Sequence, residues 1–308
     1  MRVLITGGAG FIGSHLADYY VEQNDGVVVV DNLITGSERN IAQHLSLSRF
    51  QFIKEDICDV TQVDGELDLI LHLASPASPF DYLKYPILTM RTASVGTLNM
   101  LEIAKEKNAK LLLASTSEVY GDPEQHPQSE TYWGNVNPVG PRAVYDEGKR
   151  FAEALTAAYN RTHGLNTCIV RIFNTYGERM QEDDGRVIPA FINQALKNED
   201  FTIFGDGTQT RSFCYISDMV EGITQAARAD VSGPVNLGNP KEYTMLEIAD
   251  MVKQRCGSTA QYRFMPLPEN DPKRRKPDIT LAKELLGWQP EVTLDQGLVR
   301  VIEYFRRK

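Results

Sequence analysis

Short runs of consecutive apolar residues alternate with longer segments of helical periodicity through the first 175 residues of the chain. The apolar runs lie at 3–5, 27–30, 51–53, 68–71, 110–113 and 168–172, and the helical segments lie near 11–23, 91–107 and 145–163. Continuous rather than alternating hydrophobicity is typical of strands buried on both faces, as in a parallel sheet between two layers of helices. The pattern therefore predicts an α/β fold with a doubly wound parallel sheet.

The pattern changes after residue 175, where Gly and Pro become more frequent between helices expected at 187–197, 218–228, 244–256 and 294–306. We expect two domains, with the sheet in residues 1–175 and a smaller C-terminal α/β region in residues 176–308. The segments Ser212–Ile216 and Val235–Gly238, both near 212–238, are expected to return to the first domain. The two domains would then be interleaved along the chain.

Charge and composition narrow the class of protein. The 308 residues include 32 Lys and Arg against 41 Asp and Glu, a formal net charge of −9, whereas a protein that binds nucleic acid usually has a basic face. No run of 18 apolar residues and no signal-peptide pattern is present, so we expect no membrane association. The four cysteines are far apart and the five histidines form no ligand cluster. We therefore expect free thiols, no metal site and a cytoplasmic location.

Three glycines follow the first apolar run directly and open the first helical segment. Gly7, Gly10 and Gly13 allow a tight turn, close approach of the backbone to a pyrophosphate and tight packing of helix on strand. Such a triad alone is also compatible with an ordinary strand–helix turn. Asp31, 18 positions after Gly13 and at the end of the second run, is placed to bind the adenosine ribose and to repel a 2′-phosphate. The combination predicts a Rossmann domain that binds NAD, while Arg39 keeps NADP open.

A second motif carries candidate chemistry. Tyr145 and Lys149 are four residues apart in a helical segment, so their side chains share one face. A lysine ammonium beside a phenol lowers the phenol pKa from about 10, which makes a tyrosinate base feasible. This spacing is also common on solvated helix faces. The hydroxyl-rich segment 114–121, at the carboxyl end of a central strand where α/β sheets bind ligands, favours an active site.

The chain resembles the extended short-chain dehydrogenase/reductase superfamily (the NAD-dependent epimerase/dehydratase family) over essentially its whole length. The glycine loop, the strand end at Thr116, the pair Tyr145 and Lys149, and the stretch 171–177 carry this resemblance. It is similar in more detail to the UDP-glucuronate decarboxylases, or UDP-xylose synthases. The matching stretches are 72–79, 115–123, 132–138, 140–142 and 275–278.

This resemblance implies an NAD-bound carboxy-lyase. Such an enzyme oxidises C4 of UDP-glucuronate, releases CO₂ from the 4-keto acid and returns the hydride to form UDP-xylose. It implies Tyr145 as the base, Lys149 as the group that lowers the Tyr145 pKa and holds the nicotinamide ribose, and Thr116 as the partner of the C4 oxygen. Glu118 would act near C5 of the sugar, and Arg275 would anchor phosphate and carboxylate groups.

Other reactions on the same framework stay open. A 4,6-dehydratase typically carries Asp-Glu where this chain has Ser117 and Glu118, so its acid is missing. A 4-epimerase needs no such carboxylate, and Glu118 would then only cap the strand end. A related enzyme could stop at the UDP-4-keto-pentose and release NADH. A non-catalytic NAD-binding scaffold is a further alternative, although it would not need the set Thr116, Tyr145 and Lys149.

The remaining candidates concern substrate, cofactor and assembly. Arginine suits phosphate and carboxylate oxygens, and a few arginines can gather in an acidic protein; the candidates are Arg186, Arg211, Arg274 and Arg275. The resemblance places Asn174 and Arg211 beside the diphosphate, and Tyr82 is a candidate to close over the sugar. It also implies a homodimer built on the helices near 91–107 and 145–163. The further residues expected to contact NAD are Phe11, Ile12, Asn32, Thr35, Gly36, Asp56, Ile57, Leu73, Ser75 and Thr175.

One residue departs from the family pattern. Glu178 stands where a proline is common in the stretch after Asn174. We expect this difference to alter the loop over the nicotinamide without touching the base.

Overall fold

A seven-stranded parallel sheet forms the larger part of the computed structural model, which describes residues 1–183, 185–267 and 275–308. Its order is β11-β6-β5-β4-β1-β2-β3, and this confirms the predicted doubly wound sheet. Six strands arise from the apolar runs, and β11 comes from the C-terminal half. The strands are β1 (Arg2–Thr6), β2 (Gly26–Val30), β3 (Phe50–Ile53), β4 (Leu69–His72), β5 (Lys110–Thr116), β6 (Thr167–Ile172) and β11 (Pro234–Leu237).

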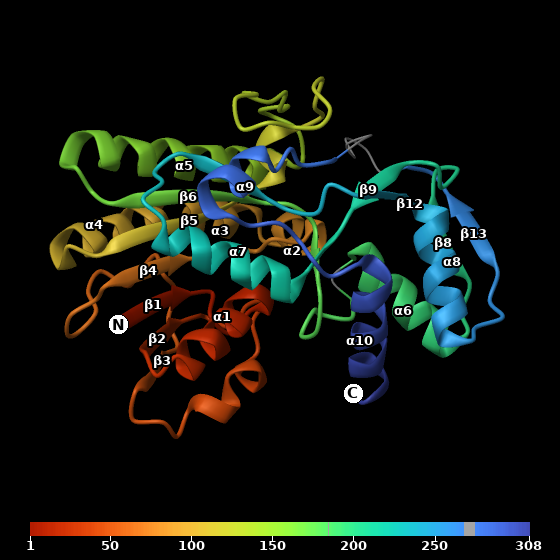
Figure 1. Ribbon diagram of the computed structural model, residues 1–308, viewed down its shortest axis with the longest axis horizontal. Helices are drawn as coiled ribbons and strands as arrows, with labels where there is room; N and C mark the ends of the chain where they lie inside the picture. The colour runs from red at the N-terminus through yellow and green to blue at the C-terminus, as the bar shows by residue number, and fades with distance from the viewer. Residues whose placement is uncertain (184, 268–274) are drawn as a thin grey trace.

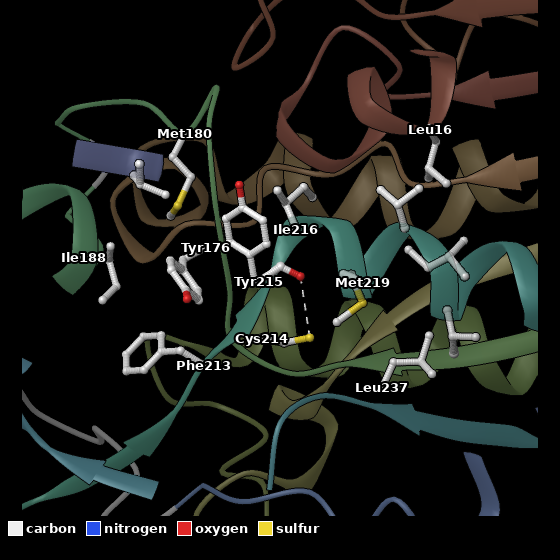
Figure 2. Packing of buried hydrophobic residues seen from close by; sticks show 14 of the residues in the cluster. Leu16, Tyr176, Met180, Ile188, Phe213, Cys214, Tyr215, Ile216, Met219 and Leu237 are labelled. Carbon is white, nitrogen blue, oxygen red and sulfur yellow. Dashed lines mark hydrogen bonds between the residues drawn. The ribbon is translucent and has the colours of Figure 1, made fainter. Parts of the chain in front are cut away.

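Alternate residues of the strands contribute to two hydrophobic cores, one on each face of the sheet. Leu4 packs in the core covered by α4 (Thr97–Lys107) and α5 (Ala143–His163), whereas Val3 and Ile5 pack in the core covered by α1 (Phe11–Glu22) and α7 (Ile216–Arg228). The second core continues past the sheet. Figure 2 shows it passing from Leu16 and Met219 to Tyr176, Phe213 and Ile188. One continuous apolar cluster therefore joins the sheet to the rest of the chain.

The smaller part gathers at the other end of the molecule from α4 (Figure 1). It contains α6 (Val187–Lys197), α8 (Met245–Cys256) and α10 (Leu294–Arg306), close to the expected ranges. Capping boxes at Thr244 and Thr293 fix the starts of α8 and α10, because each threonine and the residue three positions later satisfy the free amides of the first turn. Two short strand pairs complete it: β8 (Phe201–Phe204) with β13 (Tyr262–Met265), and β9 (Thr210–Ser212) with β12 (Glu242–Thr244).

Several elements differ from the expectation. The range 91–107, expected to be one α-helix, begins with a π-helical turn (Thr92–Gly96) that leads into α4, and two short helices precede it, α2 (Pro79–Lys84) and α3 (Pro86–Arg91). Val235–Gly238 supplies most of β11, but the segment Ser212–Ile216 does not join the main sheet. Its residues Cys214–Tyr215 form β10, which pairs with β7 (Thr175–Tyr176) instead. α9 (Thr280–Leu286) was not expected.

The described residues also show the state of the cysteines and the character of the helices. All four cysteines are free thiols, and three of them are buried. Among the described residues, no helix combines the length and apolarity that crossing a membrane requires. Within the same ranges, no cluster of three or more His, Cys, Asp or Glu side chains is placed to hold a metal ion.

Candidate active site

A cavity of about 750 Å³ lies where the carboxyl ends of the sheet strands face the smaller part of the molecule. Most of the residues predicted from the sequence line it. These are Gly7, Gly10, Phe11, Ile12, Gly13, Asp31, Asn32, Thr35, Asp56, Ile57, Leu73, Ser75, Thr116, Glu118, Tyr145, Lys149, Asn174, Thr175, Arg186, Arg211 and Arg275. Gly36 and Tyr82 are not part of its wall, and Arg274 lies outside the described residues.

The backbone of the glycine loop approaches other backbone segments so closely at Gly7 and Gly13 that a side chain would not fit at either position. A Cβ on Gly13 would lie 2.2 Å from the carbonyl oxygen of Gly7. Gly7 has a φ of +68°, and a Cβ there would lie 2.9 Å from the backbone of Ala74. Gly10 donates its amide to the Gly7 carbonyl at 3.0 Å, just before α1 begins. The loop thus places bare backbone and the amino end of a helix at the cavity wall, which suits a pyrophosphate.

Asp31 is fixed to this loop at the end of β2. Its carboxylate accepts hydrogen bonds from the amides of Ala9 at 3.0 Å and Leu33 at 2.8 Å. Burial raises the pKa of Asp31, and the backbone donors oppose that rise. Gly36 packs behind the carboxylate, since a Cβ there would lie 2.9 Å from both of its oxygens. Asp31, expected to bind the ribose, is therefore hydrogen-bonded to the glycine loop, expected to bind the phosphates. Together they fit a dinucleotide.

Tyr145 and Lys149 lie on the cavity face of α5, next to the end of β5. The Lys149 ammonium donates to the carbonyl of Ala114 at 2.8 Å and lies 5.9 Å from the centre of the Tyr145 ring. Burial lowers the pKa of Lys149 to about 8. Burial also raises the pKa of Tyr145, although a hydrogen bond with the Thr116 side chain opposes this. The expectation that the Tyr145 pKa is lowered is therefore not met, because desolvation by burial is the largest influence on it.

Tyr82 lies behind Tyr145 rather than over the cavity. The two rings are stacked with their centres 5.0 Å apart and their planes 6° apart, and Tyr82 is 1% exposed. Ser78 accepts the Asp81 amide at 3.1 Å and so caps α2, which fixes the direction of this short helix. The structure therefore differs from the expectation that Tyr82 closes over the sugar, because its ring supports the candidate base from the protein side.

Glu118 lies between two arginines at the end of β5. Arg142 donates to its Oε2 at 2.6 Å, while Arg275 approaches Oε1 at 2.7 Å and donates to Oε2 at 2.9 Å. Burial alone would raise the pKa of Glu118, but Arg275 and Arg142 together hold it below its ordinary value. Glu118 is therefore ionised at neutral pH, and it joins two segments that are 157 positions apart.

Six arginines line the described part of the cavity wall, although the chain as a whole is acidic. Arg186 lies over the ring of Phe11, 5.7 Å from its centre, and Arg211 is 9% exposed on β9. Asn174 accepts a hydrogen bond from Arg275 at 3.4 Å. Sequence reasoning assigned no role to Arg142 or Arg179. A signal for Arg142 was its position three residues before Tyr145, which places both near the same face of α5.

A glycine loop with a ribose-directed carboxylate, and a tyrosine and lysine on one helix face, define a dehydrogenase-type enzyme of the short-chain class. The chain belongs to the NAD dependent epimerase/dehydratase family, whose model matches residues 3–238. It is 52% identical over 307 residues to UDP-glucuronic acid decarboxylase 1 of Danio rerio, covering all of this chain and 73% of that protein. It is 54% identical over 308 residues to UDP-glucuronic acid decarboxylase 2 of Arabidopsis thaliana, covering all of this chain and 69% of that protein.

The solved structures similar to this chain include nucleotide-sugar epimerases and a dTDP-glucose 4,6-dehydratase. The UDP-glucuronic acid 4-epimerase of Bacillus cereus, in complex with UDP-glucuronic acid and NAD, is 32% identical with a TM-score of 0.89. The UDP-glucose 4-epimerase of Thermotoga maritima, with UDP-glucose, is 30% identical with a TM-score of 0.90. In both cases the match covers 100% of this chain and 99% of the other.

Proposed function

We propose that this chain is a UDP-glucuronate decarboxylase that uses NAD and forms UDP-xylose with no net oxidation. The observation that carries the proposal is the ionised Glu118 held by Arg142 and Arg275 in the same cavity wall as Tyr145. A guanidinium there suits a substrate that brings its own carboxylate. The relatives with 52% and 54% identity over the full chain bear the name of this activity.

The cofactor would lie along the sheet ends, in residues 1–175, and the nucleotide sugar would lie toward residues 176–308. NAD⁺ bound there would supply the hydride acceptor for C4 of the sugar and, once reduced, the hydride donor for the last step. Gly7, Gly10 and Gly13 would hold the pyrophosphate and Asp31 the adenosine ribose, where a carboxylate disfavours a 2′-phosphate. Lys149 would hold the nicotinamide ribose from the opposite wall.

Tyr145 removes the proton from the C4 hydroxyl. Thr116, already hydrogen-bonded to the Tyr145 phenol, is placed to bind the same sugar oxygen. Because burial raises the pKa of Tyr145, its ionisation depends on nearby positive charge, and Lys149 and Arg186 supply it from this chain. Tyr145 therefore acts as a base only while the positive charges of Lys149 and Arg186 lie close to its phenol.

Oxidation at C4 places the sugar carboxylate β to a carbonyl. The bond between C5 and the carboxyl carbon then breaks, CO₂ leaves, and the electron pair moves into an enolate whose oxygen faces Thr116 and Tyr145. A proton is added at C5 before the ketone is reduced. Because Glu118 is ionised, it acts as an acceptor and as an orienting charge, not as the acid that a dehydration needs.

Product identification tests this function. The purified protein is incubated with UDP-glucuronate and NAD⁺, and the sugar nucleotides, CO₂ and NADH are measured. UDP-xylose and CO₂ without net NADH are expected. The 4-epimerase alternative, which is the activity named for the Bacillus cereus neighbour at 32% identity, would give a UDP-hexuronate that keeps its carboxylate. UDP-4-keto-pentose with stoichiometric NADH would indicate an enzyme that stops halfway, and no turnover would indicate a scaffold.

We also propose that the chain forms a homodimer through α3, α4 and α5. Large apolar side chains recur on this surface with helical spacing and are unusually exposed, with Ile87 at 71%, Met90 at 43% and Leu98 at 41%. A stripe of this kind suits a second copy of the same helices. Light scattering of Ile87→Glu and Leu98→Glu should give half the mass of the unmodified protein.

The free thiols favour a reducing compartment, and we propose the cytoplasm.

A further inference from the structure

The segment Arg275–Asp278 is bound to the sheet side of the active site through one buried glutamine. The side-chain oxygen of Gln128 accepts a hydrogen bond from the backbone amide of Lys276 at 2.8 Å, and the backbone amide of Gln128 donates to the Lys276 carbonyl at 2.9 Å. Its carbonyl accepts the Asp278 amide at 2.8 Å. Gln128 therefore fixes the backbone on both sides of Lys276, directly after Arg275.

Gln128 is rigid because all of its polar groups are satisfied in the interior. It is 0% exposed, and its side-chain nitrogen donates to the carbonyl of Gln125 at 2.7 Å. Its carbonyl also accepts a hydrogen bond from Asn236 at 3.0 Å. Each nitrogen and oxygen of this buried residue has a partner, so a shift of the side chain would leave a polar atom unpaired.

The same network reaches the other partner of the ion pair. Asn236 lies on β11, is 0% exposed and donates to the carbonyls of Gln128 and Asp278. It accepts the Tyr120 hydroxyl at 2.8 Å, and Tyr120 belongs to the 3₁₀ turn Ser117–Tyr120 that carries Glu118. Asn236 on β11 therefore connects the segment that carries Glu118 with the segment that follows Arg275.

We propose that Gln128 is a positioning residue for the reaction: it holds the backbone beside Arg275 so that this guanidinium meets Glu118 and the anionic substrate. The proposal rests on the proposed function, in which Arg275 binds substrate. Gln128 itself does not line the cavity. Its action passes through the placement of Arg275, and small displacements of such groups reduce rates strongly.

The test uses Gln128→Met, which keeps the length of the side chain and removes the acceptor for the Lys276 amide. We expect kcat/KM for UDP-glucuronate to fall by about ten- to a hundredfold, with the affinity for NAD⁺ unchanged. Because Arg275 lowers the pKa of Glu118, the acidic limb of the pH profile should move to higher pH in this variant. Gln125→Ala is the matched control: it is an exposed glutamine of the same loop whose side chain bonds Ser129 instead.

A double-mutant cycle with Arg275→Met shows whether the effect passes through Arg275. If it does, adding Gln128→Met to Arg275→Met lowers kcat/KM little further, whereas additive losses would overturn the proposal. Loss of activity in Arg275→Met with normal turnover in Gln128→Met would overturn the positioning role alone. Full decarboxylation by Arg275→Met would contradict the substrate-binding role of Arg275, whereas no decarboxylation by the unmodified protein would contradict the proposed function itself.

Hydrogen exchange of the unmodified protein gives a test that does not depend on how the variant folds. The amides of Lys276 and Asp278 should exchange as slowly as those of β6, because both are bonded to Gln128. Exchange at the rate of an unstructured peptide would overturn the proposal. Slow exchange together with the shifted pH profile supports it.

Discussion

Replacing Glu118 by glutamine keeps the shape of the side chain but removes the charge that two arginines share. Arg142 and Arg275 make three contacts of 2.6 to 2.9 Å with this carboxylate, and its side chain is only 12% exposed. Breaking a buried ion pair by neutralising one partner costs about 3 to 5 kcal/mol, because the remaining charges stay desolvated. With an unfolding entropy of about 2.1 cal/mol/K per residue, a chain of this length should lose roughly 5 to 8 °C in Tm.

The pH dependence identifies the cause of this loss. The arginines hold the pKa of Glu118 below its ordinary value of 4.5, so the ion pair stabilises the fold fully above that pH. Its contribution disappears as the pH falls through the lowered pKa of the folded protein. The Tm difference between the unmodified protein and Glu118→Gln should therefore be constant near neutrality and should narrow in acid.

Calorimetry at several pH values measures this difference, and product analysis with UDP-glucuronate measures its effect on chemistry. Glu147→Gln is the matched control, since Glu147 is half-buried and contacts Arg150 at 3.4 Å; its loss should be below about 1 kcal/mol. We expect kcat of Glu118→Gln to fall by about a hundredfold or more. Unchanged decarboxylation in this variant would refute the chemical role of Glu118, and an unchanged Tm would refute the energetic argument.

Three further predictions concern the base and the cofactor loop. Tyr145→Phe should lower single-turnover oxidation by about a hundredfold or more while NAD⁺ titration calorimetry stays normal; retained turnover would exclude Tyr145 as the base. In Gly13→Ala the new methyl group would lie 2.2 Å from the Gly7 carbonyl, so the Kd for NAD⁺ should rise by about tenfold or more in the same titration, and an unchanged Kd would contradict this close approach. Asp31→Ser removes the charge that repels a 2′-phosphate, and the ratio of NADP⁺ to NAD⁺ affinity should rise by about tenfold; a constant ratio would show that discrimination lies elsewhere.

The sequence predicts most of the sheet and the long helices because buried parallel strands are continuously apolar. It does not predict β8 and β13, because neither strand is continuously buried: β8 contains an exposed residue and half of the residues in β13 are exposed. The short helices α2 and α9 carry too few turns for a periodic signal. Glycine loop, Asp31 and Tyr145 could be found because their function depends on local spacing. The ion pairs of Glu118 with Arg142 and Arg275 could not be found from the sequence, since they join residues 24 and 157 positions apart.

The position of β11 has a consequence for how the protein is made. This edge strand covers β6, yet 65 residues separate the end of β6 at Ile172 from the end of β11 at Leu237. At a synthesis rate of about 5 to 20 residues per second, the growing chain exposes the open edge of β6 for roughly 3 to 13 s. Unpaired strand edges are sites of aggregation, so we expect nascent chains that stop between these strands to depend on chaperones and chains that include β11 to be released from them.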